Sequence, residues 1–146
     1  MSNIQGVTGE YLVAADLCKR GYFAFLSAAG MRYDLVVDVG GTLLRVQVKS
    51  CLQQTMQPGH RTPTYLFNIS RGYRDGAPRK QLAAGEADLY ALVAIDTGEV
   101  AYLPAAKAIG KKSIKIRANT AADSGWTKRS NKFEHLSIEK ALKEIL

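Results

Sequence analysis

The stretch DLVVDVGGTLLRVQVK, residues 34–49, decides the fold of this chain. It contains two runs of alternating apolar and polar residues, joined by Gly40-Gly41, a pair typical of a tight two-residue β-hairpin loop. With these glycines as the loop, Asp34 faces Gln47 across the hairpin. Alternation along each strand then gives the hairpin one apolar and one polar face. The apolar face comprises Leu35, Val37, Val39, Leu44, Val46 and Val48, and the polar face comprises Asp34, Asp38, Arg45, Gln47 and Lys49.

The segments on either side of this hairpin predict an α/β domain. Residues 4–20 place Val7, Ala14 and Leu17 at helical spacing and end before Gly21, a common helix terminator. A last helix is predicted after Ser137, which can cap its first turn. Further strands are predicted for short runs at residues 22–26, 64–69, 89–95 and 100–103, with an edge strand at 114–117. We therefore expect a central mixed sheet of about six strands, flanked by helices.

Length and composition place the chain among ordinary folded proteins. Its 146 residues, 47% of them hydrophobic, fit a single domain spanning residues 1–146. The longest apolar run, residues 89–95, is much shorter than a membrane helix, and the N-terminus lacks a basic and apolar leader. The two cysteines and two histidines are too widely spaced for a zinc-finger pattern. A cytoplasmic location is the resulting expectation.

The charge distribution favours a polyanionic partner. The formal net charge is +7, yet residues 1–60 are nearly neutral, with five basic and four acidic side chains. The excess lies downstream, in one basic patch within residues 71–80 and another within residues 107–132. We therefore expect the second half of the chain to contact nucleic acid.

Glu10 is the carboxylate that departs from an ordinary amphipathic pattern. It lies on the first helix with Val13 and Leu17 three and seven residues further on, along the stripe that should face the core. Burial of an unpaired carboxylate costs several kcal/mol, so Glu10 needs a cation, a metal or a proton. Lys49, or a metal held by Asp34, can supply that partner. Two simpler interpretations stay open: Glu10 reaches water at the margin of the stripe, and the polar hairpin face is merely solvated.

Glu10 on a helix, Asp34 on a strand and Gln47-Val48-Lys49 on the next strand together resemble the PD-(D/E)XK nuclease superfamily. Within it, the sequence is similar to the branch of group I intron-encoded homing endonucleases, over residues 6–10, 32–37, 44–50, 88–93 and 100–104. The resemblance implies a restriction-endonuclease-like core over about residues 1–104, which leaves residues 105–146 as a basic C-terminal extension.

The resemblance also implies a role for each site residue. Phosphodiester hydrolysis needs an attacking water and a Lewis acid, and Mg²⁺ prefers oxygen ligands. Asp34 is expected to be the principal metal ligand and the Val48 carbonyl the second. Lys49 is expected to position or activate the water, while Glu10 binds the metal, directly or through water, and holds Lys49. Gln47 stands where the superfamily name requires Asp or Glu, which predicts a less negative site with one metal per subunit, or alternatively an inactive protein.

The DNA contacts are expected in the second half of the chain. The segment after the hairpin contains side chains able to reach base edges, namely Gln53, Gln54, Gln57 and Arg61. Phosphate contacts are expected from Arg71, Arg74, Arg79, Lys80, Lys111, Lys112, Lys128 and Arg129. A plain polar loop and solvated charges are the alternative interpretations.

The sequence thus predicts a Mg²⁺-dependent endonuclease of double-stranded DNA, of the homing type. A chain this small covers a long target poorly, and the resemblance implies a homodimer or homotetramer. Three alternatives remain at this stage. One is a Holliday junction resolvase of the same superfamily, which cuts branched DNA, and another is a nucleic-acid-binding protein without catalysis. The third is a small restriction-type or repair nuclease.

Overall fold

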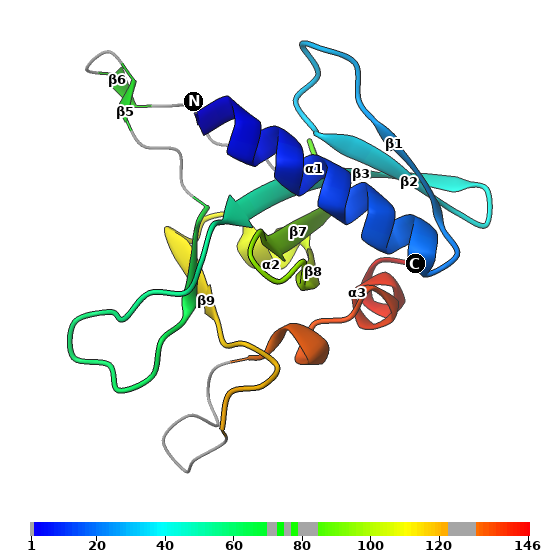
Figure 1. The fold of residues 1–146 in the computed structure, drawn as a ribbon. Helices are drawn as coiled ribbons and strands as arrows, with labels where there is room; N and C mark the ends of the chain where they lie inside the picture. The colour runs from blue at the N-terminus through cyan, green and yellow to red at the C-terminus, as the bar shows by residue number, and fades with distance from the viewer. Residues whose placement is uncertain (1, 70–72, 75–76, 79–84, 123–130) are drawn as a thin grey trace.

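A central mixed sheet organises the molecule. The computed structural model describes residues 2–69, 73–74, 77–78, 85–122 and 131–146 (Figure 1). The sheet has five strands in the order β1-β2-β3-β7-β8, and only β3 and β7 pair in parallel among these neighbours. Their bounds are β1 Phe23–Leu26, β2 Leu35–Val39, β3 Thr42–Cys51, β7 Leu89–Ala94 and β8 Val100–Pro104. This confirms the predicted α/β class with a mixed sheet.

The β2–β3 hairpin forms in the predicted register. Val39 pairs with Thr42 and Leu35 pairs with Val46, so the loop consists of Gly40-Gly41. Both glycines have positive φ, 59° and 93°, a conformation that residues with a Cβ rarely adopt. The Asp38 carboxylate accepts a hydrogen bond from the Gly41 backbone N–H at 2.8 Å, which fixes this turn. Asp38 therefore has a structural role in this turn.

The predicted strand at residues 64–69 forms, but outside the central sheet. Strand β4, Tyr65–Asn68, pairs antiparallel with β9, Ser113–Ile116, in a separate two-stranded sheet. The expectation of about six central strands was therefore wrong, because a short apolar run shows that a strand is buried without showing which strand it pairs with. Two two-residue strands, β5 Tyr73–Arg74 and β6 Ala77–Pro78, form a further small hairpin that the sequence did not predict.

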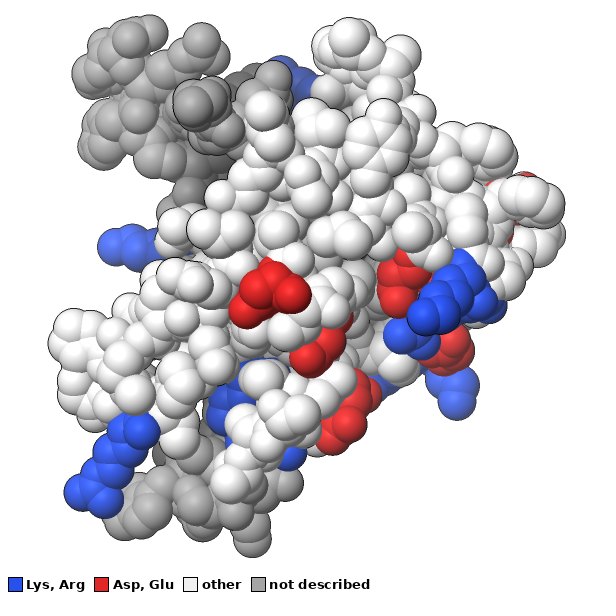
Figure 2. Space-filling view, viewed as in Figure 1, with Lys and Arg blue, Asp and Glu red and all other residues white. Residues whose placement is uncertain are grey.

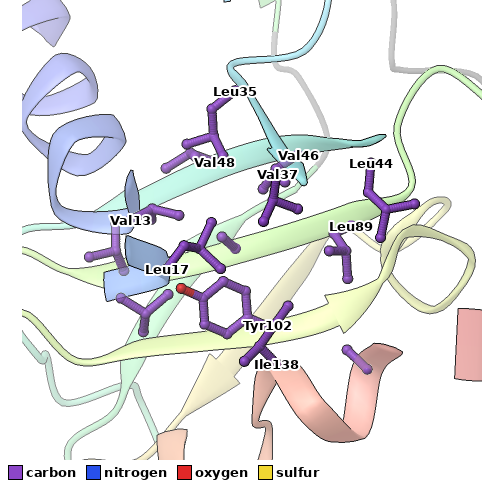
Figure 3. Close-up of a cluster of buried hydrophobic side chains, with 14 of the residues drawn as sticks. Val13, Leu17, Leu35, Val37, Leu44, Val46, Val48, Leu89, Tyr102 and Ile138 are labelled. Atoms are coloured by element: carbon purple, nitrogen blue, oxygen red, sulfur yellow. The ribbon is translucent and has the colours of Figure 1, made fainter. Parts of the chain in front are cut away.

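Two hydrophobic clusters hold the layers together. The first lies under α1, Ser2–Lys19, and α3, Ile138–Ile145, and Figure 3 shows its side chains meeting between these helices and the sheet. Its members include Val13, Leu17, Leu35, Val37, Val46, Leu89, Tyr102 and Ile138. The second cluster joins the sheet to the β4–β9 pair, and its members include Tyr65, Phe67, Tyr90, Leu92, Leu103, Ile116 and Phe133. Both clusters use residues beyond 104.

The first helix buries the stripe that the sequence predicted. Val13 and Leu17, which define that stripe, are fully buried, whereas Val7, also at helical spacing, is 39% exposed. Helix α1 therefore carries apolar side chains on its outer side as well as on its buried side.

The last helix agrees with the sequence. Ser137 Oγ accepts a hydrogen bond from the Lys140 backbone N–H, and Ile138, Ala141 and Leu142 are buried. Two short helices, α2 Ala105–Ala108 and the 3₁₀ helix η1 Phe133–His135, complete the elements. No helix among the described residues is long and apolar enough to span a membrane.

Candidate active site

The structure brings Glu10 of α1 into contact with Asp34, the residue directly before β2. The two carboxyl groups share a hydrogen bond, and Glu10 is half-buried. Burial, then the negative charge of Asp34 and this hydrogen bond, raise the pKa of Glu10 from its ordinary 4.5 to about 6. A proton or a cation between the two groups relieves this repulsion. The structure thus brings together two of the four residues that the sequence grouped at the site, although the sequence named Lys49 or a metal, not a direct contact with Asp34, as the partner of Glu10.

Asp34 is held in place by the backbone of β3. Its backbone N–H donates to the Val46 carbonyl at 2.9 Å, and its carboxylate Oδ2 accepts from the Val48 N–H at 2.8 Å. The two bonds go to Val46 and Val48, the residues before and after Gln47. Asp34 is therefore fixed opposite Gln47, as the hairpin register predicts. The Asp34 side chain therefore has little freedom to turn away from the site.

Gln47 supplies a third oxygen. Its side chain is 5% exposed, and its Oε1 is buried without a hydrogen-bond partner in the part of the chain that the structure describes. An unpartnered buried amide oxygen costs free energy and is uncommon in folded proteins. The sequence identified Gln47 as a neutral residue at a position where the superfamily motif has an acid. It could not show that the amide oxygen has no partner.

Lys49 follows Gln47 by two residues in β3 and shares its face of the strand. Val46 and Val48, which alternate with Gln47 and Lys49 along β3, lie in the first hydrophobic cluster, on the opposite face of the strand. The Lys49 side chain is half-buried. The polar hairpin face near Asp34 is therefore partly enclosed, in contrast to the simpler interpretation of a solvated surface.

Gly9 allows α1 to approach the strands closely enough for Glu10 to reach Asp34. A Cβ at Gly9 would overlap Ser50 Oγ and come within 3.1 Å of Val93 Cγ1. Gly6 on the same helix has nothing within 4 Å of such a Cβ. Helix α1 thus contacts β3 and β7 through a position where any side chain is too large.

The oxygens at this site fit a hard divalent cation. Two adjacent carboxylates, one with a raised pKa, and a buried amide oxygen without a partner form a donor set of the kind that Mg²⁺ prefers. Within the described ranges, no three His, Cys, Asp or Glu side chains come together as metal ligands. Gln47, which faces Asp34 in the hairpin register, is a neutral amide and not one of these four residue types.

The predicted DNA contacts fall into described and undescribed groups. Gln53, Gln54, Gln57 and Arg61 lie in the loop between β3 and β4, where all but the half-buried Gln57 are exposed. Lys111 and Lys112 are exposed just before β9. The side chain of Arg74, in β5, is not described. Outside the described residues lie Arg71, Arg79, Lys80, Lys128 and Arg129.

The structure adds two residues that the sequence did not include in this group. Lys115 of β9 places its Nζ 3.4 Å from His60 Nε2 in the β3–β4 loop, so the loop and the basic strand lie side by side. Alternation of Lys115 with Ile114 and Ile116 was the signal that could have identified it as a surface side chain.

Three comparisons with known proteins bear on this site. The sequence model of a family described as PD-(D/E)XK endonuclease matches residues 2–136. Among solved structures, the bacterial homing endonuclease I-Ssp6803I superposes with a TM-score of 0.67, covering 99% of this chain and 94% of that one. At 17% sequence identity, this similarity shows the fold alone. The search of curated protein sequences finds no match. Because the match to the family covers most of the residues, including all four at the site, the chain belongs to the PD-(D/E)XK endonuclease family.

Proposed function

We propose that this protein is a Mg²⁺-dependent, site-specific endonuclease that cuts double-stranded DNA. We further propose that it acts as a homo-oligomer in the cytoplasm and that residues 1–146 form one domain. The observation that carries the proposal is the contact between the Glu10 and Asp34 carboxyl groups beside the unpartnered Gln47 oxygen, with Lys49 on the same strand face. The structural similarity to a homing endonuclease supports the site-specific type. The free Cys18 and Cys51 fit a reducing compartment.

Four oxygen donors would hold the cation. These are the Asp34 and Glu10 carboxylates, the Gln47 amide oxygen and the Val48 carbonyl. When bound, Mg²⁺ supplies Lewis-acid stabilisation of the scissile phosphate. Asp34, fixed by the Val48 N–H, sets the position of the phosphate relative to β3. With Gln47 in place of an acid, the side chains contribute two negative charges, which favours one cation per subunit.

Lys49 would act on the attacking water. Its ammonium group can donate a hydrogen bond to water and stabilise the charge that develops as a proton leaves. Glu10 would orient this ammonium as well as the cation. Partial burial strengthens both interactions, because the effective dielectric is lower than in bulk water.

DNA would approach along the β3–β4 loop and strand β9. Gln53, Gln54, Gln57 and Arg61 offer groups for base edges, and Lys111, Lys112 and Lys115 offer charges for phosphates. The loop begins where β3 ends, two residues beyond Lys49, so contacts there are continuous with the site. The basic residues that the structure does not describe, Arg71, Arg74, Arg79, Lys80, Lys128 and Arg129, are proposed to extend this surface.

A substrate comparison tests the proposal. Wild-type protein and Lys49→Ala are incubated with a library of long duplex DNAs and with a synthetic four-way junction, in Mg²⁺ or in EDTA. We expect discrete duplex fragments from the wild type in Mg²⁺ alone, and DNA binding without fragments from Lys49→Ala. Cleavage confined to the junction would identify a resolvase, and binding without any cleavage by the wild type would overturn the catalytic proposal.

A further inference from the structure

The outer side of α1 carries an uncharged strip that nothing described in the chain covers. Its members, Ile4, Val7, Tyr11, Ala15 and Cys18, recur at intervals of three or four residues and are all exposed. Ile4 is 71% and Tyr11 61% exposed. The opposite side of the helix is buried through Val13 and Leu17. A helix that is apolar on two sides is normally buried on both, so this strip indicates a partner.

The charge of the strip limits the kind of partner. None of its five residues is a Lys, Arg, His, Asp or Glu. In Figure 1 α1 lies in front of β3 and β7, and Figure 2 shows a broad uncharged area on this side of the molecule. DNA would find no cation here for its phosphates. Because the strip contains no lysine or arginine, two copies of a chain with a net charge of +7 can meet here without bringing like charges together within the strip.

The order of residues along the strip is self-complementary in one arrangement. If two α1 helices pack antiparallel about a two-fold axis at Tyr11, Ile4 lies opposite Cys18 of the second copy and Val7 lies opposite Ala15. Ile4 and Val7 then each meet a smaller side chain, as close helix packing favours, and the two Tyr11 rings meet at the axis. Under two-fold symmetry each contact also occurs twice, which a homodimer needs.

We propose that the outer strip of α1 is the dimer interface, with the α1 helices of two copies packed antiparallel around Tyr11. Glu10, although next to Tyr11 in sequence, is turned toward Asp34, so the pairing leaves the candidate active site uncovered. The inference deepens the proposed function, on which it rests, because the second copy supplies the second catalytic site that cutting both DNA strands requires. One helix strip is small compared with the roughly 800 Å² per partner of a standard interface, so we expect micromolar association.

Disulfide trapping tests the register. In a Cys51→Ser background, Ile4→Cys is oxidised mildly without DNA or metal, and we expect an interchain bond between position 4 and Cys18 of the second copy, identified by mass spectrometry. Adding Cys18→Ser should abolish this bond. As a control, Leu43→Cys places a thiol at a comparably exposed position away from the strip, where Leu43 is 62% exposed. A bond joining position 4 to position 4, or trapping at position 43 as efficient as at position 4, would overturn the proposal.

Sedimentation equilibrium provides the second arm. Tyr11→Glu places two carboxylates at the two-fold axis and should weaken dimerisation by at least about tenfold, whereas Leu43→Glu should leave it unchanged. Circular dichroism checks that both variants fold. A wild type that stays monomeric throughout the micromolar range, or a Tyr11→Glu variant that dimerises normally, would overturn the proposal. Because no DNA is present, these results stand apart from the cleavage assays that test the proposed function.

Discussion

At the scale of single residues, the site holds two features that reduce stability, the Glu10–Asp34 contact and the unpartnered Gln47 oxygen. The sequence singled out these residues, and the hairpin register that aligns Asp34 with Gln47 forms as predicted. It could not predict that Gln47 Oε1 lacks a partner, which depends on the packing of side chains from distant segments. Both features would cost less free energy with a cation bound between these groups than without one.

Replacing Glu10 by Gln should make the metal-free protein more stable at pH 8. The pKa of Glu10 is about 6 in the folded state against an ordinary 4.5, so the folded protein disfavours the ionised form. Its destabilisation is absent below pH 4.5, grows between pH 4.5 and 6, and is complete above pH 6. Full conversion of the shift gives roughly 2 kcal/mol, and we expect about 1 kcal/mol because the group is partly solvated.

Urea unfolding of wild type and Glu10→Gln in EDTA, at pH 4.5 and at pH 8, measures this difference. The gain in the free energy of unfolding should appear at pH 8 and nearly vanish at pH 4.5, while cleavage in Mg²⁺ is lost. An equal difference at both values of pH would show that ionisation of Glu10, disfavoured by burial and by the charge of Asp34, is not its cause.

Replacing Gln47 by Glu should tighten metal binding. A third carboxylate adds negative charge to the Glu10–Asp34 pair, and we expect about a tenfold lower dissociation constant for Mn²⁺ or Mg²⁺, with a less stable metal-free protein. Isothermal titration calorimetry measures the affinity, and Gln53→Glu, in the exposed loop, provides a matched control of the same charge change. Equal affinities for wild type and Gln47→Glu would place the Gln47 side chain outside the metal site.

At the scale of elements, the sequence predicted those whose signal is local and missed those that depend on distant partners. Gly40-Gly41 defines the β2–β3 loop, and with it the register that aligns Asp34 with Gln47. Strand β4 was predicted in the wrong sheet because its partner, β9, lies far along the chain. The inner face of α1 was predicted through Val13 and Leu17, but the exposure of Val7 was not, since apolar residues on both sides of a helix look alike in sequence.

Gly9→Ala should impair cleavage, because the added methyl overlaps Ser50 Oγ and approaches Val93, and so shifts α1 with Glu10 away from β3. A displacement of about 1 Å can cost roughly 100-fold in rate, so we expect a loss of at least about tenfold in kcat. Gly6→Ala is the control: nothing lies within 4 Å of its Cβ, and it should add about 0.5–1 kcal/mol of helix stability.

Steady-state cleavage together with urea unfolding distinguishes these effects. Ser50→Gly in the Gly9→Ala background removes the overlapping hydroxyl and should restore part of the activity, although the approach to Val93 remains. Gly9→Ala with the activity of Gly6→Ala would show that the close contact of α1 with β3 does not position Glu10.

At the scale of the whole molecule, charge and hydrophobicity are segregated. The α1 side carries the uncharged strip, while Lys111, Lys112 and Lys115 lie at the β9 end beside the β3–β4 loop. Sequence analysis predicted that the basic excess lies downstream of residue 60, but not that Lys115 meets the loop, because this contact depends on how β4 and β9 pair. The β3–β4 loop, which begins where β3 ends, thus connects the strand of the candidate site to this basic surface.

The measurement that tests the central claim most directly compares two isosteric variants in one DNA cleavage assay with Mg²⁺. Asp34→Asn removes a charge at the site and can still accept the bond from the Val48 N–H, whereas Asp38→Asn removes one from the hairpin turn and can still accept from Gly41. We expect at least about a 100-fold loss of cleavage for Asp34→Asn, with DNA binding retained, and little change for Asp38→Asn. Equal activity of Asp34→Asn and the wild type would contradict the account.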